Sequence, residues 1–429
     1  MEENRAYNKT KLDNGVTIIS ELDANVYSAT IGVWVKKGSR NERDLERGIS
    51  HFIEHMLFKG TSNRNCLQIA REIDALGGVL NAFTTHESTC YYVKLLKEHA
   101  GVASSILEDI FVNSLFDADE IERERKVILQ EISMIEDAPD DQIHDLFAET
   151  FWGDHPLGRP VTGTIESVSS FKRDDFLGFV ERNYRPENIV IAAAGNVDHD
   201  RVVNSFSDSF SRLKKGPDDE PATEPVYSSN LKFVKKKLEQ VHFCLGTKGV
   251  SSANPRRYAA YMMNSVLGDG MSSRLFQEIR EKRGLAYSIY SYMSTYQDSG
   301  NFGICAGTGK GSFSESVELA ALEMKKMREK KISGSELSSV KEQMKSGILI
   351  SMENSESRMQ RIADNEMTFG RNLPVEEIIE NIESVTVDDV HDMAGELLRE
   401  ESLNLAVLGN LKRGVVESTM EKVREMLKG

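Results

Sequence analysis

An internal echo constrains the fold of this chain more than any other feature of its sequence. The apolar segment 188–196 (NIVIAAAGN) is echoed by 404–410 (NLAVLGN), and Lys37-Gly38 after one strand-like run is echoed by Lys248-Gly249 after another. Both echoes fall at a shift of about 210 residues, which is typical of a duplicated domain rather than of a short solenoid repeat. Two short echoes can also arise by chance. We nevertheless predict two homologous domains.

The length of the chain agrees with a duplication, because 429 residues exceed what one hydrophobic core usually supports. The segment 214–223 is rich in proline, glycine and charge, as linkers often are. We expect an N-terminal domain over residues 1–215, a linker over 216–230 and a C-terminal homologous domain over 231–429.

Within the first half, strand-like and helix-like patterns alternate in blocks. Runs rich in β-branched and aromatic residues predict strands over 16–20, 28–36 and 91–95. Apolar residues at helical spacing predict helices over 45–58, 67–76, 103–113 and 118–135. This mixture favours α+β domains, each a sheet with helices packed against it.

Charge and cysteine usage exclude some classes of partner. The net charge of −15 argues against nucleic-acid binding, and no apolar run approaches the length that spans a membrane. Cys66, Cys90, Cys244 and Cys305 form no CxxC pair, so neither a structural zinc site nor a disulfide framework is indicated. The acidic segment 1–5 lacks the character of a targeting signal. We therefore expect a cytoplasmic protein in a reducing compartment.

The segment HFIEH carries the strongest chemical signal. Residues four apart share one face of a helix, so His51 and His55 can bind one metal ion. Glu54 lies beside them, in the inverted order of the commoner HExxH motif. A separate apolar stripe is formed by Leu45, Ile49, Phe52 and Met56. The histidines thus lie off the core face, although a solvated face without a metal remains an alternative for this motif alone.

A catalytic zinc site needs a third protein ligand. The predicted helix over 118–135 offers Glu124 and Glu131, seven residues apart, along the edge of its buried stripe. A carboxylate beside an apolar stripe is costly if it is buried, unless it is paired or bound to a metal. A salt bridge with Arg125, or with a basic residue on another helix, would also explain these carboxylates.

These segments together resemble the pitrilysin/insulinase and mitochondrial-processing-peptidase family of zinc peptidases, and most of all its short bacterial members. HFIEHMLFKGT (51–61), followed about 75 residues later by the glutamate of VILQEI, is similar to the family's HxxEH motif with its distal glutamate. Further matches are LGGVLNAFT (76–84), HPLGRPVTGT (155–164) and MSSRLFQEIREKRGLAYS (271–288). The matches span both halves of the chain.

The resemblance implies one zinc ion per chain, held by His51, His55 and Glu131, with Glu124 as a supporting group. The implied reaction is hydrolysis of peptides or unfolded segments by a zinc-activated water. Glu54 would act as the general base, taking the proton of that water and passing it to the leaving amine.

Residues outside the metal motif also acquire roles from the resemblance. Tyr287 matches a family tyrosine that reaches the substrate, and it is the better candidate for an oxyanion donor. Arg280 would hold the substrate backbone or position Tyr287. Without the family match, Arg280 would be a solvated residue at a helix end. The family's edge strand, to which an extended peptide can add by main-chain pairing, matches Asn81, Ala82, Phe83 and Thr84.

The architecture implied by the resemblance is two homologous α+β domains, each a mainly antiparallel sheet with packed helices, paired as a clamshell around a cavity. Family members of this length act as pairs of chains, so we expect a homodimer or a heterodimer with a paralogue. The histidines without metal spacing are expected to be structural or solvated, namely His86, His99, His144, His155, His199, His242 and His391. Two alternatives stay open: a catalytically silent partner or scaffold subunit, and a metal hydrolase that acts on a non-peptide substrate.

Overall fold

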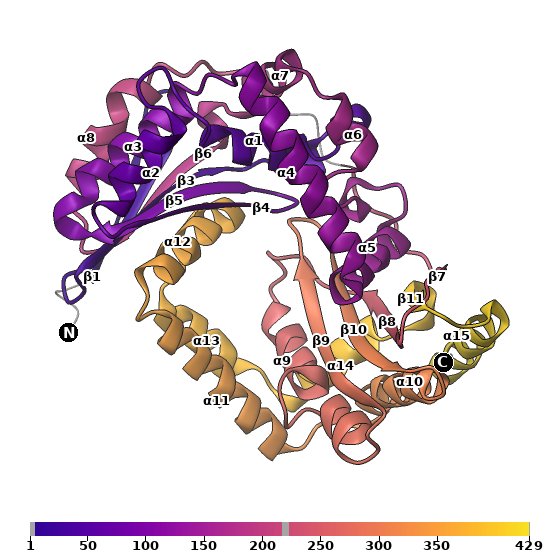
Figure 1. Ribbon diagram of the computed structural model, residues 1–429. Coiled ribbons are helices and arrows are strands. Elements are labelled where there is room, and N and C mark those ends of the chain that lie inside the picture. The colour runs from indigo at the N-terminus through magenta and orange to yellow at the C-terminus, as the bar shows by residue number, and fades with distance from the viewer. Residues whose placement is uncertain (1–4, 217–222, 429) are drawn as a thin grey trace. The chain divides into compact units, whose positions relative to one another are not determined.

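The computed structural model describes residues 5–216 and 223–428, which form two compact units. The first unit comprises the described residues of Met1–Met134, Arg159–Pro221 and Leu349–Leu373. The second comprises the described residues of Ile135–Gly158, Ala222–Ile348 and Pro374–Gly429. Each unit holds one sheet with helices against it, so the predicted α+β class is confirmed (Figure 1).

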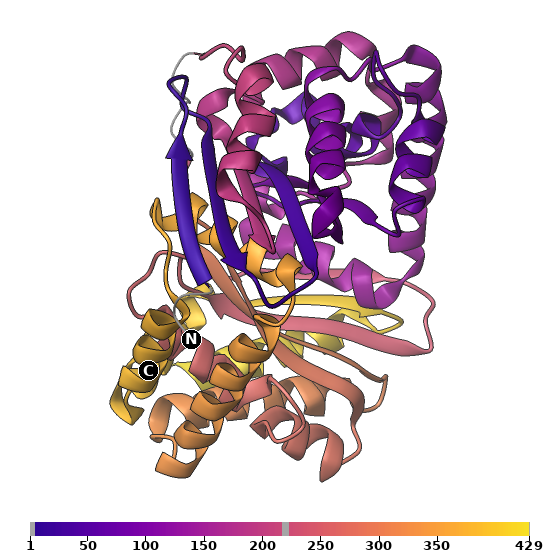
Figure 2. The same ribbon diagram turned by 90° about the vertical axis from the view of Figure 1, so that its left-hand side faces the viewer.

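The first sheet has six strands in the order β1-β2-β6-β3-β5-β4. Their bounds are Arg5–Lys11 (β1), Thr17–Asp23 (β2), Ser28–Val35 (β3), Val79–Thr84 (β4), Thr89–Leu96 (β5) and Ile189–Gly195 (β6). All neighbouring strands run antiparallel except β2 and β6, which are parallel. The β1–β2 hairpin lies at one edge (Figure 2), and β4 forms the other edge.

The central strands of this sheet are apolar on both faces. β6 reads IVIAAAG and β3 reads SATIGVWV, and nearly all of their residues are buried. A strand with such an unbroken apolar sequence needs cover on both sides. One face is covered by α1 (Ile49–Leu57), α2 (Cys66–Asp74), α3 (Ala100–Val112), α4 (Ala118–Asp137), α6 (Ile165–Ser170), α7 (Arg173–Asn183) and α8 (His199–Phe210).

The opposite face of the first sheet is covered by α12 (Ser355–Phe369), which comes from the second half of the sequence. Met359, Ile362 and Ala363 of this helix are fully buried against the sheet. The indole N–H of Trp34 donates a hydrogen bond to the sulfur of Met359 at 3.3 Å. This helix therefore belongs to the first unit by its packing.

The second sheet has five strands in the order β7-β11-β8-β10-β9. Their bounds are Leu231–Lys235 (β7), Gln240–Lys248 (β8), Ala286–Thr295 (β9), Gly300–Gly309 (β10) and Asn404–Gly409 (β11). The β7–β11 pair is parallel and the other pairs are antiparallel. This arrangement repeats β2-β6-β3-β5-β4 strand for strand, and the two echoed segments fall on β6 and β11. The predicted duplication is therefore confirmed.

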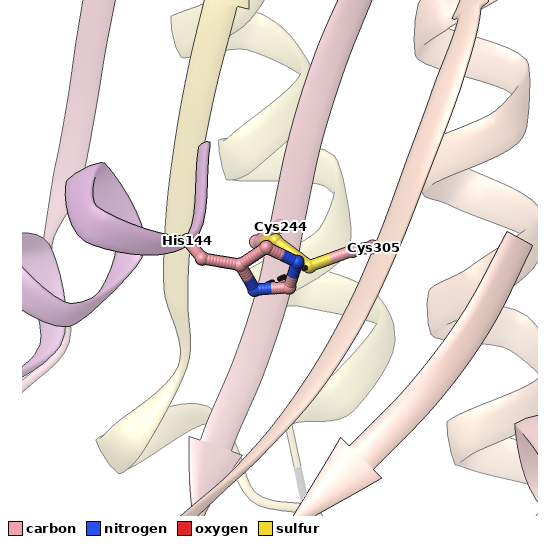
Figure 3. A group of neighbouring side chains, drawn as sticks. All are labelled: His144, Cys244 and Cys305. Carbon is pink, nitrogen blue, oxygen red and sulfur yellow. Dashed lines mark hydrogen bonds between the residues drawn. A yellow bond between two sulfur atoms is a disulfide. The ribbon is translucent and has the colours of Figure 1, made fainter. Parts of the chain in front are cut away.

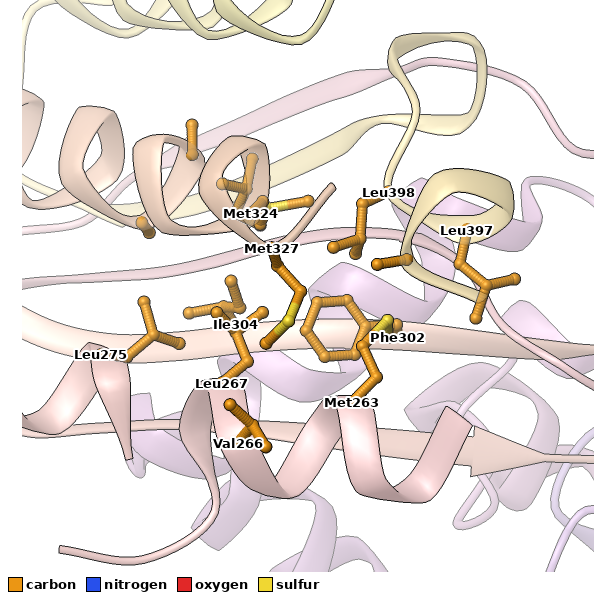
Figure 4. Close-up of a cluster of buried hydrophobic side chains, with 14 of the residues drawn as sticks. Met263, Val266, Leu267, Leu275, Phe302, Ile304, Met324, Met327, Leu397 and Leu398 are labelled. Atoms are coloured by element: carbon orange, nitrogen blue, oxygen red, sulfur yellow. The ribbon is translucent and has the colours of Figure 1, made fainter. Parts of the chain in front are cut away.

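Helices also cover both faces of the second sheet. On one face, Met263, Phe302 and Met327 pack in the core of the unit (Figure 4). The helices of this face are α9 (Arg257–Gly268), α10 (Phe313–Glu329), α11 (Gly334–Ser351), α13 (Val375–Ser384), α14 (Val387–Leu397) and α15 (Arg413–Leu427). The other face is covered by α5 (Pro139–Trp152), which buries Phe147 and Phe151 against it.

The compact units differ from the predicted division into residues 1–215 and 231–429 in two segments, 135–158 and 349–373. The physical reason is that each sheet has a second apolar face, which a helix from the other half of the sequence covers. If each domain were one continuous stretch of sequence, that face would be exposed to water. Of the predicted linker, residues 217–222 lie outside the described residues. Residues 216 and 223–230 form no helix or strand.

The predicted helices of the first half are present as α1 to α4, with one correction. The first helix begins at Ile49, whereas Leu45 lies in a short 3₁₀ turn and is 87% exposed. Leu45 is therefore wrongly placed in the apolar stripe of the HFIEH helix.

Among the described residues, no helix is both long enough and apolar enough to span a bilayer.

The expectation that the cysteines form no disulfide is also wrong. Cys244 in β8 and Cys305 in β10 are direct cross-strand partners, and they are joined by a disulfide. Cys66 and Cys90 are free. The two bridged cysteines lie 61 residues apart, so only the register of the sheet reveals their pairing.

Candidate metal centre

The helix that carries HFIEH is preceded by a glycine, and a carboxylate from earlier in the chain caps its first turn. Gly48 has φ 89°, and a Cβ there would lie 2.6 Å from the backbone oxygen of Thr162. A larger residue would therefore clash. The carboxylate of Glu42 accepts hydrogen bonds from the backbone N–H groups of Gly48 at 2.8 Å and Ser50 at 2.9 Å. These bonds satisfy donors that the first turn of α1 leaves open.

The three predicted ligands, His51, His55 and Glu131, lie close together within the first unit. His51 Nε2 lies 3.7 Å from Glu131 Oε1, and His55 Nε2 lies 3.8 Å from Glu131 Oε2. Candidate ligand atoms of the three residues all lie within 4.8 Å of one another. The two distances are too long for hydrogen bonds. They are close to the roughly 3.3 Å that separates nitrogen and oxygen ligands around a tetrahedral zinc ion.

The surroundings of the two histidines suit metal binding. His51 is 8% exposed, and burial followed by the neighbouring His55 lowers its pKa to about 4. It is thus neutral near pH 7, so one of its ring nitrogens carries a lone pair. His55 Nδ1 lies 3.1 Å from Glu124 Oε2. A hydrogen bond donated from this nitrogen to the carboxylate leaves Nε2 free for a metal, as in many zinc sites.

Glu124 supports His55 rather than joining the ligand cluster. Its second oxygen, Oε1, forms an ion pair with Lys59 Nζ at a distance of 2.6 Å. Burial opposes ionisation of Glu124, but the hydrogen bonds from His55 and Lys59 lower the pKa of its carboxyl group. The salt-bridge alternative thus holds for Glu124, with Lys59 as the basic partner. Arg125 is not that partner, because it binds Glu122 and backbone oxygens.

Glu54 projects beside this cluster and is held by a hydroxyl group. Thr84 Oγ1 donates a hydrogen bond to Glu54 Oε2 at 2.6 Å. Burial raises the pKa of the Glu54 carboxyl group, whereas the bond from Thr84 opposes that rise. Sequence reasoning placed Thr84 on a substrate strand but missed its contact with Glu54. No local pattern reports a contact between residues thirty positions apart.

The predicted substrate segment lies on an edge strand of the first sheet. Asn81, Ala82, Phe83 and Thr84 form the last part of β4, which pairs with β5 on one side. Among the described residues no strand pairs with its other side. Its outward backbone groups are thus placed where an extended chain could pair.

Arg280 and Tyr287 lie in the second unit, where the structure brings them together. Tyr287, on β9, is 79% exposed, and the guanidinium carbon of Arg280 lies 5.0 Å from the centre of its ring. The same guanidinium lies 4.5 Å from the ring centre of Phe276, on the π-helical segment η7 (Phe276–Glu281). Arg280 therefore makes cation–π contacts with two aromatic rings instead of extending freely into solvent.

The second unit has no counterpart of the histidine pair. Its α9 follows β8 as α1 follows β3, and it carries YMMNSVL from Tyr261 onward where a metal motif would stand. Among the described residues, the other cluster with ligand spacing is His144, Cys244 and Cys305. Sequence reasoning missed that cluster, as it missed Glu42 and Lys59.

A duplicated α+β fold with HxxEH on one helix and a distal glutamate on another defines the class of inverted-motif metallopeptidases. Residues 17–165 match the family model described as insulinase (peptidase family M16), and residues 170–344 match the peptidase M16 inactive domain. The chain belongs to this family.

Proteins named as uncharacterized zinc proteases are similar along nearly the whole chain. The one from Bacillus subtilis is 40% identical over 388 residues, covering 90% of this chain and 95% of the relative. The one from Rickettsia felis is 40% identical over 417 residues, covering 96% and 100%. The one from Streptomyces coelicolor is 39% identical over 414 residues, covering 94% and 90%.

Solved structures agree with the fold. A protease from Helicobacter pylori has a TM-score of 0.85 at 23% identity, covering 94% of this chain and 99% of the other. A Pseudomonas fluorescens structure titled as a peptidase M16 inactive domain has a TM-score of 0.87 at 18% identity, covering 95% and 98%. At these identities the likeness concerns the fold alone.

Proposed function

We propose that this protein is a zinc metalloendopeptidase that hydrolyses peptides or unfolded segments, with Glu54 as the general base. The observation that carries the proposal is the convergence of His51, His55 and Glu131, whose candidate ligand atoms lie within 4.8 Å of one another. The relatives named zinc proteases support the choice of metal.

The donor set fits one zinc ion per chain. Two imidazole nitrogens and one carboxylate are the ligands of many catalytic zinc sites, which keep a fourth position open. His51 is neutral near pH 7, and the Glu124 carboxylate orients the ring of His55. When bound, zinc acidifies water and polarises a carbonyl group.

The remaining chemistry falls to residues of the chain. The Glu54 carboxylate, fixed by Thr84, can accept a proton from the attacking water and later deliver it to the leaving amine. Burial raises the pKa of Glu54, which makes its carboxylate a stronger base toward the attacking water. The ligand set is complete, which favours an active peptidase over a silent partner subunit.

The edge strand supports a peptide as the substrate. An extended peptide can pair with the free side of β4, whose last residue, Thr84, contacts Glu54. Main-chain pairing reads backbone more than side chains, so we expect broad specificity. A non-peptide substrate would have no use for this strand.

The test compares the protein with Glu54→Gln on unstructured peptides. We expect Glu54→Gln to keep zinc at His51, His55 and Glu131 and to lose at least about 10²-fold in kcat, because the ligands remain while the base is gone. Glu98→Gln, which alters an exposed carboxylate outside the cluster, is the matched control. Zinc-loaded Glu54→Gln with full activity would refute the assigned base. Zinc-loaded wild-type protein that cleaves no peptide in a diverse library would refute the peptidase.

A further inference from the structure

A second group of potential ligands lies inside the second unit, between α5 and the sheet it covers. Cys244 and Cys305 face each other across β8 and β10, and His144 reaches them from α5 (Figure 3). His144 Nδ1 lies 4.0 Å from Cys305 Sγ, and candidate ligand atoms of the three residues all lie within 4.8 Å of one another. Sequence reasoning treated His144 as structural or solvated, but the fold places it against two sulfur atoms.

The imidazole of His144 is oriented by a second contact. Its Nε2 lies 2.7 Å from the hydroxyl oxygen of Tyr290. A hydrogen bond donated from Nε2 to Tyr290 leaves a lone pair on Nδ1, the nitrogen that lies 4.0 Å from Cys305 Sγ. Metal-binding histidines commonly carry such an outer partner on the nitrogen that does not bind the metal.

The group is buried but has a route of access from the surface. Cys244 is 0% and Cys305 2% exposed, among the apolar side chains that α5 packs on the sheet. Tyr290 is 38% exposed, so the His144 side of the group reaches the surface.

We propose that the reduced chain binds a second metal ion of the zinc class through Cys244 Sγ, Cys305 Sγ and His144 Nδ1, and that the Cys244–Cys305 disulfide abolishes this site. Two thiolates and one imidazole select thiophilic ions such as Zn²⁺. Around a tetrahedral zinc, sulfur and nitrogen ligands lie roughly 3.5–3.8 Å apart. The 4.0 Å between His144 and Cys305 therefore needs only a small adjustment.

The sulfur atoms of Cys244 and Cys305 cannot form the disulfide and bind the ion at the same time. A phosphine reduces the disulfide by taking oxygen from water: the S–S bond breaks, two thiols form with the two protons of that water, and the phosphine becomes its oxide. Binding of the ion then displaces the two thiol protons. The disulfide ties β8 to β10, whereas the ion would also tie α5 to both strands through His144.

The probe is Co²⁺, which gives strong near-ultraviolet absorption only when thiolates bind it. The full chain is purified in a phosphine reductant, and thiol titration in denaturant checks for four thiols when reduced and two when oxidised. We expect the thiolate absorption in the reduced protein and its absence in the oxidised protein. Zinc analysis should give two ions per chain in the reduced form and one in the oxidised form.

The oxidised wild-type chain is the best control. Its disulfide removes both thiolate ligands without any substitution, and Cys66 and Cys90 stay free. His144→Gln and Cys305→Ser in the reduced chain should each weaken cobalt binding by at least about 10-fold, with circular dichroism confirming the fold. His51→Ala/His55→Ala should keep the thiolate absorption while losing the other metal ion. Equal absorption in the reduced and oxidised chains, or one zinc per chain in both, would overturn the proposal.

This inference is independent of the proposed peptidase activity, and the two can fail separately. The cluster of His51, His55 and Glu131 contains no sulfur, so it contributes nothing to the thiolate absorption. Peptide hydrolysis without the absorption would refute the second site alone. Absorption without hydrolysis would refute the peptidase alone.

Discussion

At the scale of single residues, one hydroxyl group governs the proposed base. Thr84 Oγ1 donates to Glu54 Oε2 at 2.6 Å, and this bond lowers a pKa that burial raises. Glu54 acts as a base only when it is ionised, so activity should fall as the pH drops through its pKa. Thr84 is thus a positioning residue, because it acts through Glu54 and not on the reacting atoms.

We expect Thr84→Val to lower kcat about 10- to 100-fold at neutral pH while zinc content stays unchanged. Without the hydrogen bond, burial raises the pKa of Glu54 further, so the acidic limb of the kcat/KM profile should move to higher pH. Thr84→Ser keeps the hydroxyl and should restore both the rate and the profile. A Thr84→Val protein with the wild-type profile would show that the bond does not tune Glu54.

The two glutamates of α4 should differ in their effect on zinc. Glu131 faces both histidines, so Glu131→Gln removes a ligand, whereas Glu124→Gln removes only the partner of His55. We expect Glu124→Gln to weaken zinc affinity about 10- to 100-fold and Glu131→Gln to weaken it more. Chelator competition measures both affinities, with Glu98→Gln as the control. If Glu124→Gln proved the more damaging, the ligand assignment would have to be exchanged.

Part of the candidate site was predictable because helical spacing is local. His51 and His55 share a face whatever the rest of the chain does, and the edge of a long amphipathic helix offers both Glu124 and Glu131. The choice of Glu131 as the third ligand came from the family resemblance. The contacts of Glu42 and Lys59 were not predictable. They depend on where a loop returns and on how α1 and α4 pack, which no spacing within one element reports.

At the scale of secondary-structure elements, the central strands could be recognised from the sequence, but the helices that cover them could not. The unbroken apolar runs of β3 and β6 signal strands buried on both faces. Several helices have suitable apolar stripes, and the sequence does not say which sheet each one covers. The assignment of α5 and α12 to sheets from the other half of the chain is a property of tertiary packing alone.

The packing of α12 leads to a prediction about stability. Met359 is fully buried and receives the indole hydrogen bond of Trp34. We expect Met359→Ala to lower the free energy of unfolding of the first unit by about 2–5 kcal/mol, because it opens a cavity. Leu349→Ala, at a side chain that is 51% exposed, should change it by less than about 0.5 kcal/mol. Denaturant unfolding compares the two, and equal effects would contradict the packing of α12.

At the scale of the whole molecule, the two units of the duplicated fold carry different chemical groups. The first unit holds the histidine and glutamate cluster, whereas the second has kept the strand order without the motif and exposes Tyr287 beside Arg280. A duplicated fold whose copies carry different groups is expected when both copies serve one reaction. We therefore expect neither unit to be a sufficient peptidase.

The last prediction tests this division of labour. Tyr287→Phe keeps the ring that Arg280 contacts and removes only the hydroxyl, the expected hydrogen-bond donor to the oxyanion. We therefore expect kcat to fall about 10²- to 10³-fold with zinc retained. Chains with Glu54→Gln are then mixed with chains with Tyr287→Phe, after exchange of subunits has been verified. Recovered activity would mean that two chains of a dimer share their sites, whereas no recovery would mean that each chain completes its own. Unchanged kcat in Tyr287→Phe would remove the second unit from the chemistry.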